Sequence, residues 1–320
     1  MKITILDDYQ NVVKDLKCFD TIKNQEVEII NYTEKNIDKL AELLSETEIL
    51  ILIRERTSVS AELLEKLPNL KLISQTGKIS NHLKLETCTQ YKVAVAEGIG
   101  SPIAPAELTW NLIMNTVRKL PQAIDGMKDG NWQTNIGNTI YGKTLGIWGY
   151  GKIGQKIAQY AKVFGADVVI WGSENAREKA QNDGFLAAKS KEDFFQTIDI
   201  FTTHLRLNEA TKGIIKQNDL ALMKENASFI NTARAELVEE NALINILKSG
   251  QKINIGLDVY ENEPVTDQHF ELLQYLNVIC VPHMGYVEMD SYELYFSKAF
   301  ENALNFINNT PTNIANPEIL

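Results

Sequence analysis

A glycine-rich segment near the middle of the chain has the residue types that bind a dinucleotide. Gly149-Tyr150-Gly151-Lys152-Ile153-Gly154 has the pattern GxGxxG. The first glycine of this pattern permits a tight turn, the second lets the backbone approach a pyrophosphate, and the third lets a helix pack closely on a strand. The pattern is weak alone, but here it lies between a strand-like run at 144–148 and a helical pattern at 152–164, and a second strand-like run follows at 168–171. The sequence therefore predicts a phosphate-binding turn at the start of a helix.

The residues after the second of these strands bear on the choice between NAD and NADP. Glu174 lies 20 positions after Gly154, where an acid commonly binds the ribose hydroxyls of NAD, but it stands two positions beyond the expected strand end. Gly172 and Ser173 could instead leave space for the 2′-phosphate of NADP, with Arg177 as its cation, or both charges could be solvated at a helix start. We expect NAD, because Glu174 would repel a 2′-phosphate, and NADP stays open.

Three further segments follow predicted strands in the second half of the chain and carry side chains that bind or protonate small molecules. They are Asn231-Thr232-Ala233-Arg234, Asp258-Val259-Tyr260-Glu261-Asn262-Glu263-Pro264 and Pro282-His283-Met284-Gly285. Ligands of open α/β sheets bind outside the carboxyl ends of the strands, so we expect all three segments near the nucleotide. Individually, Arg234 could be a surface charge, Glu263 a turn residue and His283 a loop histidine. Together, behind a nucleotide-binding turn, they favour one site.

Two series of apolar, β-branched runs must position these residues. Helical spacing separates the runs, and this alternation predicts an α/β fold with two doubly wound parallel-sheet domains. The first series comprises residues 3–6, 27–30, 49–53, 72–74 and 93–95, and the second comprises 144–148, 168–171, 198–203, 227–231, 253–257 and 278–281.

The joints between the two domains are predicted from small residues and proline. The segment 98–102 leads into a helix that includes Pro105, has Trp110, Ile113, Val117 and Leu120 on one face, and ends at Pro121. Residues 289–307 predict a last amphipathic helix, which we expect to pack back on the first domain and so leave a cleft between the two. The expected domains are therefore residues 1–101 plus 288–320 and residues 102–287.

Composition excludes several classes of protein. The 320 residues carry a formal charge of −10, which argues against nucleic acid or an anionic membrane surface as the main partner. Three scattered cysteines predict neither a disulfide framework nor a thiolate metal site. The N-terminus resembles no signal peptide, and no apolar run approaches the roughly 20 residues of a membrane helix. We expect a soluble, cytoplasmic protein with no metal.

The motifs, in this order, resemble those of the D-isomer-specific 2-hydroxyacid dehydrogenase family, in its D-3-phosphoglycerate dehydrogenase-like branch. The resemblance extends from about Leu50 to Ile307 and includes the segments 71–78 and 105–109. It implies a flavodoxin-like substrate domain and a Rossmann nucleotide-binding domain. It also implies an NAD(P)-dependent oxidoreductase that interconverts a D-2-hydroxy acid, such as 3-phosphoglycerate or a related small hydroxy acid, and a 2-oxo acid.

The resemblance further implies a role for each catalytic candidate. Arg234 would hold the substrate carboxylate and polarise the carbonyl, His283 would be the general acid–base, and Glu263 would hydrogen-bond the other imidazole nitrogen. The alternative is a non-catalytic, NAD-sensing scaffold like the corepressors of the family, which keep much of the same site.

Ligand contacts outside the glycine turn are also implied by the resemblance. Asp258 would lie near the nicotinamide carboxamide, and His204 would line the cofactor cleft. Further cofactor contacts are expected at Ser173, Glu174, Thr232, Ala233 and Gly285. Substrate contacts are expected at Arg54, Thr76, Gly77 and Lys78, although Gly77-Lys78-Ile79 departs from the Gly-x-Gly of many relatives and Arg54 could be a surface charge.

The oligomeric state is expected from the resemblance as well. The helix at 105–120 and the polar arm at 131–141 resemble the parts with which family members form a two-fold dimer, so we expect a homodimer. Trp132 would insert into the partner subunit, or alternatively fold back on its own domain. Since the chain ends soon after the last helix, we expect no appended regulatory domain.

Overall fold

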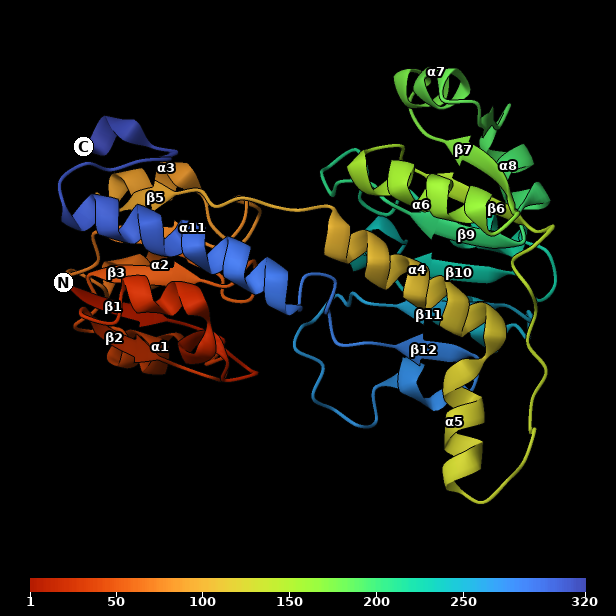
Figure 1. Cartoon of the computed structure of the whole chain (residues 1–320), viewed down its shortest axis with the longest axis horizontal. Helices are drawn as coiled ribbons and strands as arrows, with labels where there is room; N and C mark the ends of the chain where they lie inside the picture. Colours follow the sequence, from red (N-terminus) through yellow and green to blue (C-terminus); the bar gives the residue numbers. More distant parts are fainter. The chain divides into compact units, whose positions relative to one another are not determined.

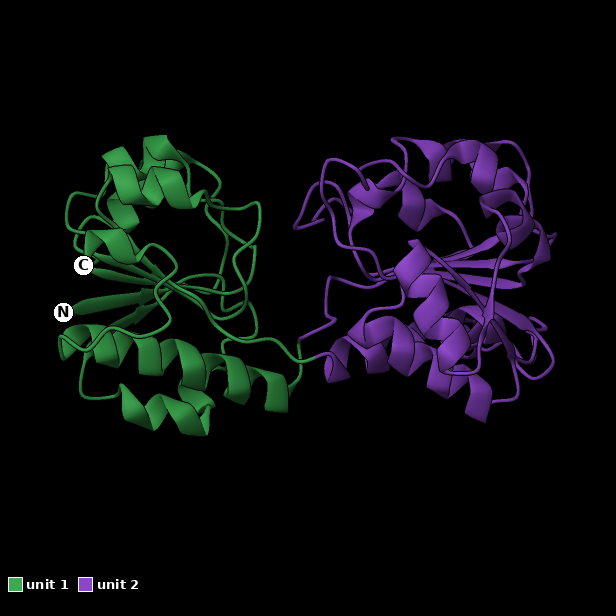
Figure 2. Ribbon diagram, turned by 90° about the horizontal axis from the view of Figure 1, so that it is seen from above, with its two compact units in different colours: residues 1–101, 287–320 green, residues 102–286 purple.

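The computed structural model describes all 320 residues, which form two compact units (Figure 2). Unit 1 comprises residues 1–101 and 287–320, and unit 2 comprises residues 102–286. Each unit contains one β-sheet in which every strand pair is parallel, as the strand–helix alternation predicts.

Unit 1 has a five-stranded sheet in the order β2-β1-β3-β4-β5, which is the flavodoxin-like order. Strands β3 and β4 are buried along their whole length, because helices cover both faces of the sheet (Figure 2). The strands are β1 (Lys2–Ile5), β2 (Glu26–Ile29), β3 (Ile49–Leu52), β4 (Leu72–Gln75) and β5 (Ala94–Ala96).

Two helices of unit 1 begin at short polar side chains that cap them. Asn36 Oδ1 accepts from Lys39 N at 3.1 Å, and Ser60 Oγ accepts from Leu63 N at 3.2 Å. The helices are α1 (Ile37–Leu43), α2 (Ala61–Glu65), α3 (Leu85–Gln90) and α11 (Met289–Ile307), with 3₁₀ turns η1 (Val13–Asp15), η2 (Lys17–Thr21) and η5 (Pro317–Ile319).

Helix α11 has the bounds that its amphipathic pattern predicts, and it belongs to unit 1 (Figure 1). The Glu288 carboxylate caps it by accepting two backbone N–H bonds. Its buried face includes Phe296 and Phe300 and packs on β4 and η2. The Ser74 hydroxyl donates to Ala299 O at 2.9 Å. The C-terminal helix thus completes the first unit across a long separation in sequence.

Unit 2 has a seven-stranded sheet in the order β12-β11-β10-β9-β6-β7-β8. The order reverses between β6 and β9, which is the Rossmann arrangement with its ligand-binding switch point. The apolar runs predict six of these strands. They miss β8 because two residues are too short to show alternation. The strands are β6 (Thr144–Trp148), β7 (Asp167–Trp171), β8 (Leu186–Ala187), β9 (Ile200–Thr203), β10 (Ser228–Asn231), β11 (Asn254–Leu257) and β12 (Val278–Cys280).

Helices α4 and α6 of unit 2 lie side by side along its sheet (Figure 1). The helices of this unit are α4 (Ile103–Arg118), α5 (Leu120–Lys128), α6 (Lys152–Val163), α7 (Glu174–Asn182), α8 (Lys191–Thr197), α9 (Gln217–Ala221) and α10 (Ala242–Lys248), with 3₁₀ turns η3 (Ala235–Leu237) and η4 (Glu271–Gln274). None of the helices in the chain combines the length and the apolar character that crossing a membrane requires.

The prediction that Pro121 ends the first helix of this unit is wrong. Helix α4 ends at Arg118, and Lys119 turns the chain with a left-handed φ of 53°. Pro121 lies in the first turn of α5, where its missing N–H costs no hydrogen bond. Leu120 is therefore 46% exposed and does not extend the buried face that includes Val117.

Candidate active site

The glycine turn connects β6 to α6 and leaves space for a phosphate. Gly149 has a φ of 105°, and a Cβ there would lie 2.8 Å from the carbonyl oxygen of His204. A Cβ on Gly154 would lie 2.1 Å from Gly149 O. A Cβ on Gly151, the N-cap of α6, would meet no atom within 4 Å. Gly149 and Gly154 therefore close the turn. Gly151 leaves open space at the N-terminus of a helix, which fits the pyrophosphate of NAD.

The side chains within this turn differ in what they can offer a cofactor. Tyr150 is buried, its ring packs edge-on against Phe185, and its hydroxyl donates to Asp183 Oδ2 at 2.9 Å. Burial raises the pKa of Tyr150 above its ordinary value, so the hydroxyl stays a donor. Lys152 is exposed and Ile153 is half-buried. Tyr150 can therefore meet a cofactor through its backbone only.

The end of β7 is where the adenosine ribose of a dinucleotide would lie. The Ser173 hydroxyl accepts from Ala176 N at 3.3 Å and so caps α7. Glu174 is exposed as the first residue of that helix. The Arg177 guanidinium lies over the Trp171 ring, 5.0 Å from its centroid. Glu174 and Arg177 thus lie near the strand end, and the Ser173 hydroxyl is already engaged as the cap of α7.

His204 and Thr232 lie directly after neighbouring strands, β9 and β10. His204 Nε2 is 3.1 Å from the Thr202 hydroxyl, and burial lowers the pKa of His204 to about 3. The imidazole is therefore neutral at pH 7. The Thr232 hydroxyl is 2.7 Å from that of Thr109, which ties this loop to α4. The sequence motifs assign no role to Thr109.

The backbone before Arg234 is held by Asn231, which is 1% exposed at the end of β10. Asn231 Oδ1 accepts from Ala233 N at 3.0 Å, and its Nδ2 donates to Arg234 O at 2.8 Å. Arg234 Nη1 donates to Ala233 O at 2.6 Å. The asparagine thus orients the loop that presents the arginine, a role that the Asn-Thr-x-Arg motif contains but does not reveal.

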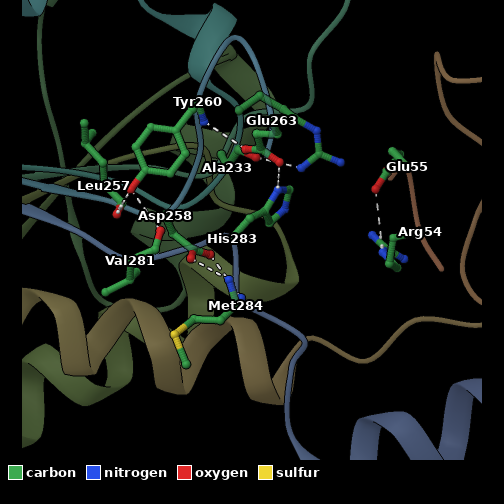
Figure 3. A network of polar contacts seen from close by, with 12 residues as sticks. Arg54, Glu55, Ala233, Leu257, Asp258, Tyr260, Glu263, Val281, His283 and Met284 are labelled. Atoms are coloured by element: carbon green, nitrogen blue, oxygen red, sulfur yellow. Dashed lines mark hydrogen bonds and ion pairs between the residues drawn. The ribbon is translucent and has the colours of Figure 1, made fainter. Parts of the chain in front are cut away.

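Glu263 and His283 form a carboxylate–imidazole pair (Figure 3). Glu263 Oε2 lies 2.5 Å from His283 Nδ1, and its Oε1 accepts from Tyr260 N at 2.9 Å. The Tyr260 hydroxyl donates to Val281 O at 2.9 Å, which links the two loops. His283 has a left-handed φ of 47°. Because Nδ1 faces the carboxylate, Nε2 is the nitrogen that can exchange a proton with a ligand.

Asp258 anchors the loop that follows β12. It is 1% exposed, and its two carboxylate oxygens accept from Met284 N at 2.6 Å and Gly285 N at 3.0 Å. Burial raises the pKa of Asp258 to about 6, although the two backbone N–H bonds act in the opposite direction. The Asp258 carboxylate therefore fixes the segment next to His283. Its expected contact with a nicotinamide stays a prediction.

In unit 1, the loops after β3 and β4 bring the four substrate candidates together. Arg54 has a left-handed φ of 54°, and its backbone N donates to the Thr76 hydroxyl at 3.1 Å. A Cβ on Gly77 would lie 2.0 Å from Arg54 Nη1, so the guanidinium lies against this glycine. Lys78 is exposed and pairs with Glu97 at 2.8 Å. The structure thus collects two cations in one loop cluster.

Glu97 hydrogen-bonds the backbone N–H of Ile79, in the loop that departs from the Gly-x-Gly pattern. Its Oε1 accepts from Ile79 N at 3.2 Å and its Oε2 pairs with Lys78. Burial acts to raise the pKa of Glu97, but these two contacts outweigh it and lower the pKa below its ordinary value. A single acidic residue after an apolar run does not reveal which distant backbone amide it binds, so the sequence did not predict this contact.

A dinucleotide-binding turn at the switch point of a Rossmann sheet, with a carboxylate–imidazole pair beyond neighbouring strands, defines the chain as a nucleotide-dependent α/β protein of the dehydrogenase type. The sequence profile described as "D-isomer specific 2-hydroxyacid dehydrogenase, NAD binding domain" matches residues 110–285, which is more than half of the chain. The chain belongs to this family. The match confirms the resemblance and NAD as the cofactor.

Individual relatives are similar over most of the chain. The crystal structure of a phosphoglycerate oxidoreductase from Vibrio cholerae has 50% identity and a TM-score of 0.95, and the match covers 97% of this chain and 99% of that one. A hydroxypyruvate reductase from Thermotoga maritima is 31% identical over 82% of this chain and 86% of that protein. A D-3-phosphoglycerate dehydrogenase from Methanocaldococcus jannaschii is 34% identical over 81% of this chain. The match spans only 49% of that last protein, about half of its length.

Proposed function

We propose that the protein is an NAD-dependent oxidoreductase that interconverts a small D-2-hydroxy acid and its 2-oxo acid. The observation that carries this proposal is the Glu263–His283 pair, 2.5 Å apart, on loops beyond the strands of an NAD-binding sheet. The pair can hold a proton at Nε2 and release it, which is the acid–base step of this reaction. Unit 2 would bind the cofactor and unit 1 the substrate.

The chemistry follows from the residues in the proposed roles. The Arg234 guanidinium would hold the substrate carboxylate with its fork of donors. When bound, NAD takes up or supplies the hydride at C2 of the substrate. His283 Nε2 would give a proton to the carbonyl oxygen during reduction and remove it from the hydroxyl during oxidation. Glu263 would hold the Nδ1 proton and stabilise the imidazolium while it is charged.

The substrate would be a small acid that carries a second anionic or polar group. Arg54 and Lys78, together in the loops of unit 1, support this choice. The names of the relatives, which act on phosphoglycerate and hydroxypyruvate, agree with it.

A panel of 2-oxo acids, followed at the nicotinamide absorbance band with NADH and with NADPH, tests the function. The panel contains 3-phosphohydroxypyruvate, hydroxypyruvate, glyoxylate and pyruvate. We expect turnover of at least one acid with NADH. A chain that binds NADH but turns over none of them would contradict the proposal and favour the non-catalytic scaffold.

We also propose a homodimer in the cytoplasm, with no nucleic-acid partner. The arm at 131–141 exposes Trp132 by 76% and Ile136 by 89%, which leaves apolar surface for a second copy. Three free cysteines, two of them buried, suit a reducing compartment. The formal charge of −10 opposes binding to a polyanion.

A further inference from the structure

Unit 2 contains a cavity of about 350 Å³ that none of the proposed cofactor or substrate residues lines. Its walls come from the segments 235–244 and 257–272, together with Asn231. Ala235, next to Arg234, belongs to one wall, and Glu261 and Pro264, on either side of Glu263, belong to the other. The cavity therefore borders the two loops that present Arg234 and Glu263.

The interior of this cavity is apolar and has the size of a small-molecule site. Leu257, Val259 and Leu272 are buried residues of its wall, and Leu243 and Phe270 add further apolar surface. Volumes of roughly 300–1,000 Å³ with mostly apolar walls are typical of ligand pockets. A cavity of this volume would hold a branched or aromatic group of roughly six to ten carbon atoms.

The charged residues of the wall are all acidic. Glu239, Glu261 and Asp267 line the cavity, and no lysine or arginine does. Glu239 accepts from Gln217 N and pairs with Lys216 Nζ at 3.6 Å, and Asp267 accepts from the backbone N of His269. Glu261 is exposed and has no hydrogen-bond or ion-pair partner in the chain. An unpaired carboxylate beside an apolar interior complements a molecule with an apolar body and one positive charge.

We infer that this cavity is a second binding site, for a small organic cation such as a primary amine with an aromatic or branched aliphatic body. Tyr260 connects the site to the catalytic loops. Its ring packs edge-on against Phe270 in the wall, with 5.7 Å between centroids. Its backbone N donates to Glu263, and its hydroxyl donates to Val281 O, two residues before His283. An occupant that contacts Tyr260 therefore acts on the residue that holds both loops (Figure 3).

Calorimetric titration of the full chain with three matched probes tests the site. The probes are 4-phenylbutylammonium, 4-phenylbutanol and 4-phenylbutyrate, which share one body and differ in charge. We expect the ammonium probe to bind about tenfold more tightly than the butyrate, because the Glu261 carboxylate attracts the ammonium and repels the carboxylate. Binding must persist with saturating NADH. Loss of binding with NADH, or equal affinity for the three probes, would overturn the inference.

Two substitutions and a control localise the probe. Leu243→Trp fills the cavity and should abolish binding, and its circular dichroism shows whether the fold is kept. Glu261→Lys, at an exposed position, should weaken the ammonium probe about fivefold or more. Glu240→Lys is the matched control, because Glu240 is exposed and does not line the cavity. Equal effects of Glu261→Lys and Glu240→Lys would refute the site, whether or not Leu243→Trp folds.

The link to the catalytic loops has its own readout, which does not depend on turnover. The ring resonances of His283, assigned by their loss in His283→Gln, should shift when the ammonium probe binds and should not shift in Leu243→Trp. Resonances of His82, a buried histidine of unit 1, serve as the reference. A bound probe that leaves His283 unchanged would refute the link and leave a binding site alone.

Discussion

At the scale of single residues, the proposed chemistry depends on carboxylates that are held by backbone amides. Glu263 accepts from Tyr260 N while it contacts His283, and Asp258 accepts from Met284 N and Gly285 N. Charge-assisted bonds of this type leave a side chain little freedom, so each carboxylate presents a defined oxygen or fixes a loop. Substitutions at these residues should therefore change rate or titration more than fold.

We predict that His283→Gln lowers kcat roughly 10²- to 10⁴-fold, the usual contribution of a general acid–base. Glutamine can still hydrogen-bond Glu263 but cannot carry the proton. Steady-state kinetics on an accepted 2-oxo acid would measure kcat, and fluorescence titration would show nearly unchanged NADH affinity. His269→Gln, at an exposed position, is the control. Near wild-type turnover by His283→Gln would remove this residue from the mechanism.

Asp258 should make the free energy of unfolding depend on pH. The pKa of this carboxyl is about 6 in the folded protein, whereas its ordinary value, which holds in the unfolded chain, is 3.8. The folded state therefore binds the proton more tightly. Its contribution to stability is full below pH 3.8 and is lost as the pH rises through 6. At 1.36 kcal/mol per unit the loss is roughly 3 kcal/mol.

Urea denaturation at several pH values between 4 and 7 would measure this dependence. We expect Asp258→Asn to show a flatter profile than the wild type over this interval, whatever its absolute stability. Parallel profiles for the two proteins would show that the carboxyl ionises normally in the fold.

At the scale of elements, strand ends and the turns after them decide what each unit can bind. Strand β7 leads through Gly172 into α7, so the helix cap and the charges near the ribose position share one short segment. The loops after β3 and β4 likewise bring Arg54 against Gly77. A small change in such a segment should alter recognition without loss of the sheet behind it.

The β7–α7 segment should favour NADH over NADPH. Glu174 is exposed at the start of α7, where its charge opposes a 2′-phosphate. We predict that Glu174→Gln raises kcat/KM for NADPH roughly two- to fivefold and changes that for NADH less. Glu178→Gln, also exposed on α7, is the matched control. A wild-type preference for NADPH would instead point to Arg177, which lies against Trp171.

The contact between Gly77 and Arg54 offers a test of unit 1. A methyl group on Gly77 would lie 2.0 Å from Arg54 Nη1, so Gly77→Ala must displace the guanidinium. We predict a rise in KM for the 2-oxo acid of about tenfold, the loss of one charge-assisted hydrogen bond, with little change in kcat. Gly100→Ala, where the methyl group meets nothing within 4 Å, is the control. An unchanged KM would exclude Arg54 from substrate binding.

At the scale of the whole molecule, the exposed arm at 131–141 bears on whether two chains associate. Trp132 is 76% exposed, and apolar side chains of this size are common anchors of interfaces. We predict a dimer at micromolar concentration by sedimentation velocity, and a dissociation constant raised at least about tenfold by Trp132→Ala. Tyr32→Ala, another exposed aromatic, is the control. A wild-type monomer would contradict the dimer.

The sequence by itself determined the features that depend on short-range pattern. Apolar runs and helical spacing locate eleven of the strands and the exact span of α11, because burial on one or both faces imposes a period on neighbouring residues. The GxGxxG turn is also local, since all of its steric requirements lie within one strand–turn–helix unit. Strand β8, with two residues, is too short to carry such a period.

Only the tertiary structure decided which side chains meet. Glu263 and His283 are 20 positions apart and touch because their loops follow neighbouring strands. Tyr150 turns inward to Asp183 although it stands within the cofactor motif. Glu97 occupies the Ile79 amide, and the cavity behind Tyr260 exists only between folded segments. A period reports which face of an element is buried, whereas a hydrogen bond or a cavity depends on where distant elements place their atoms.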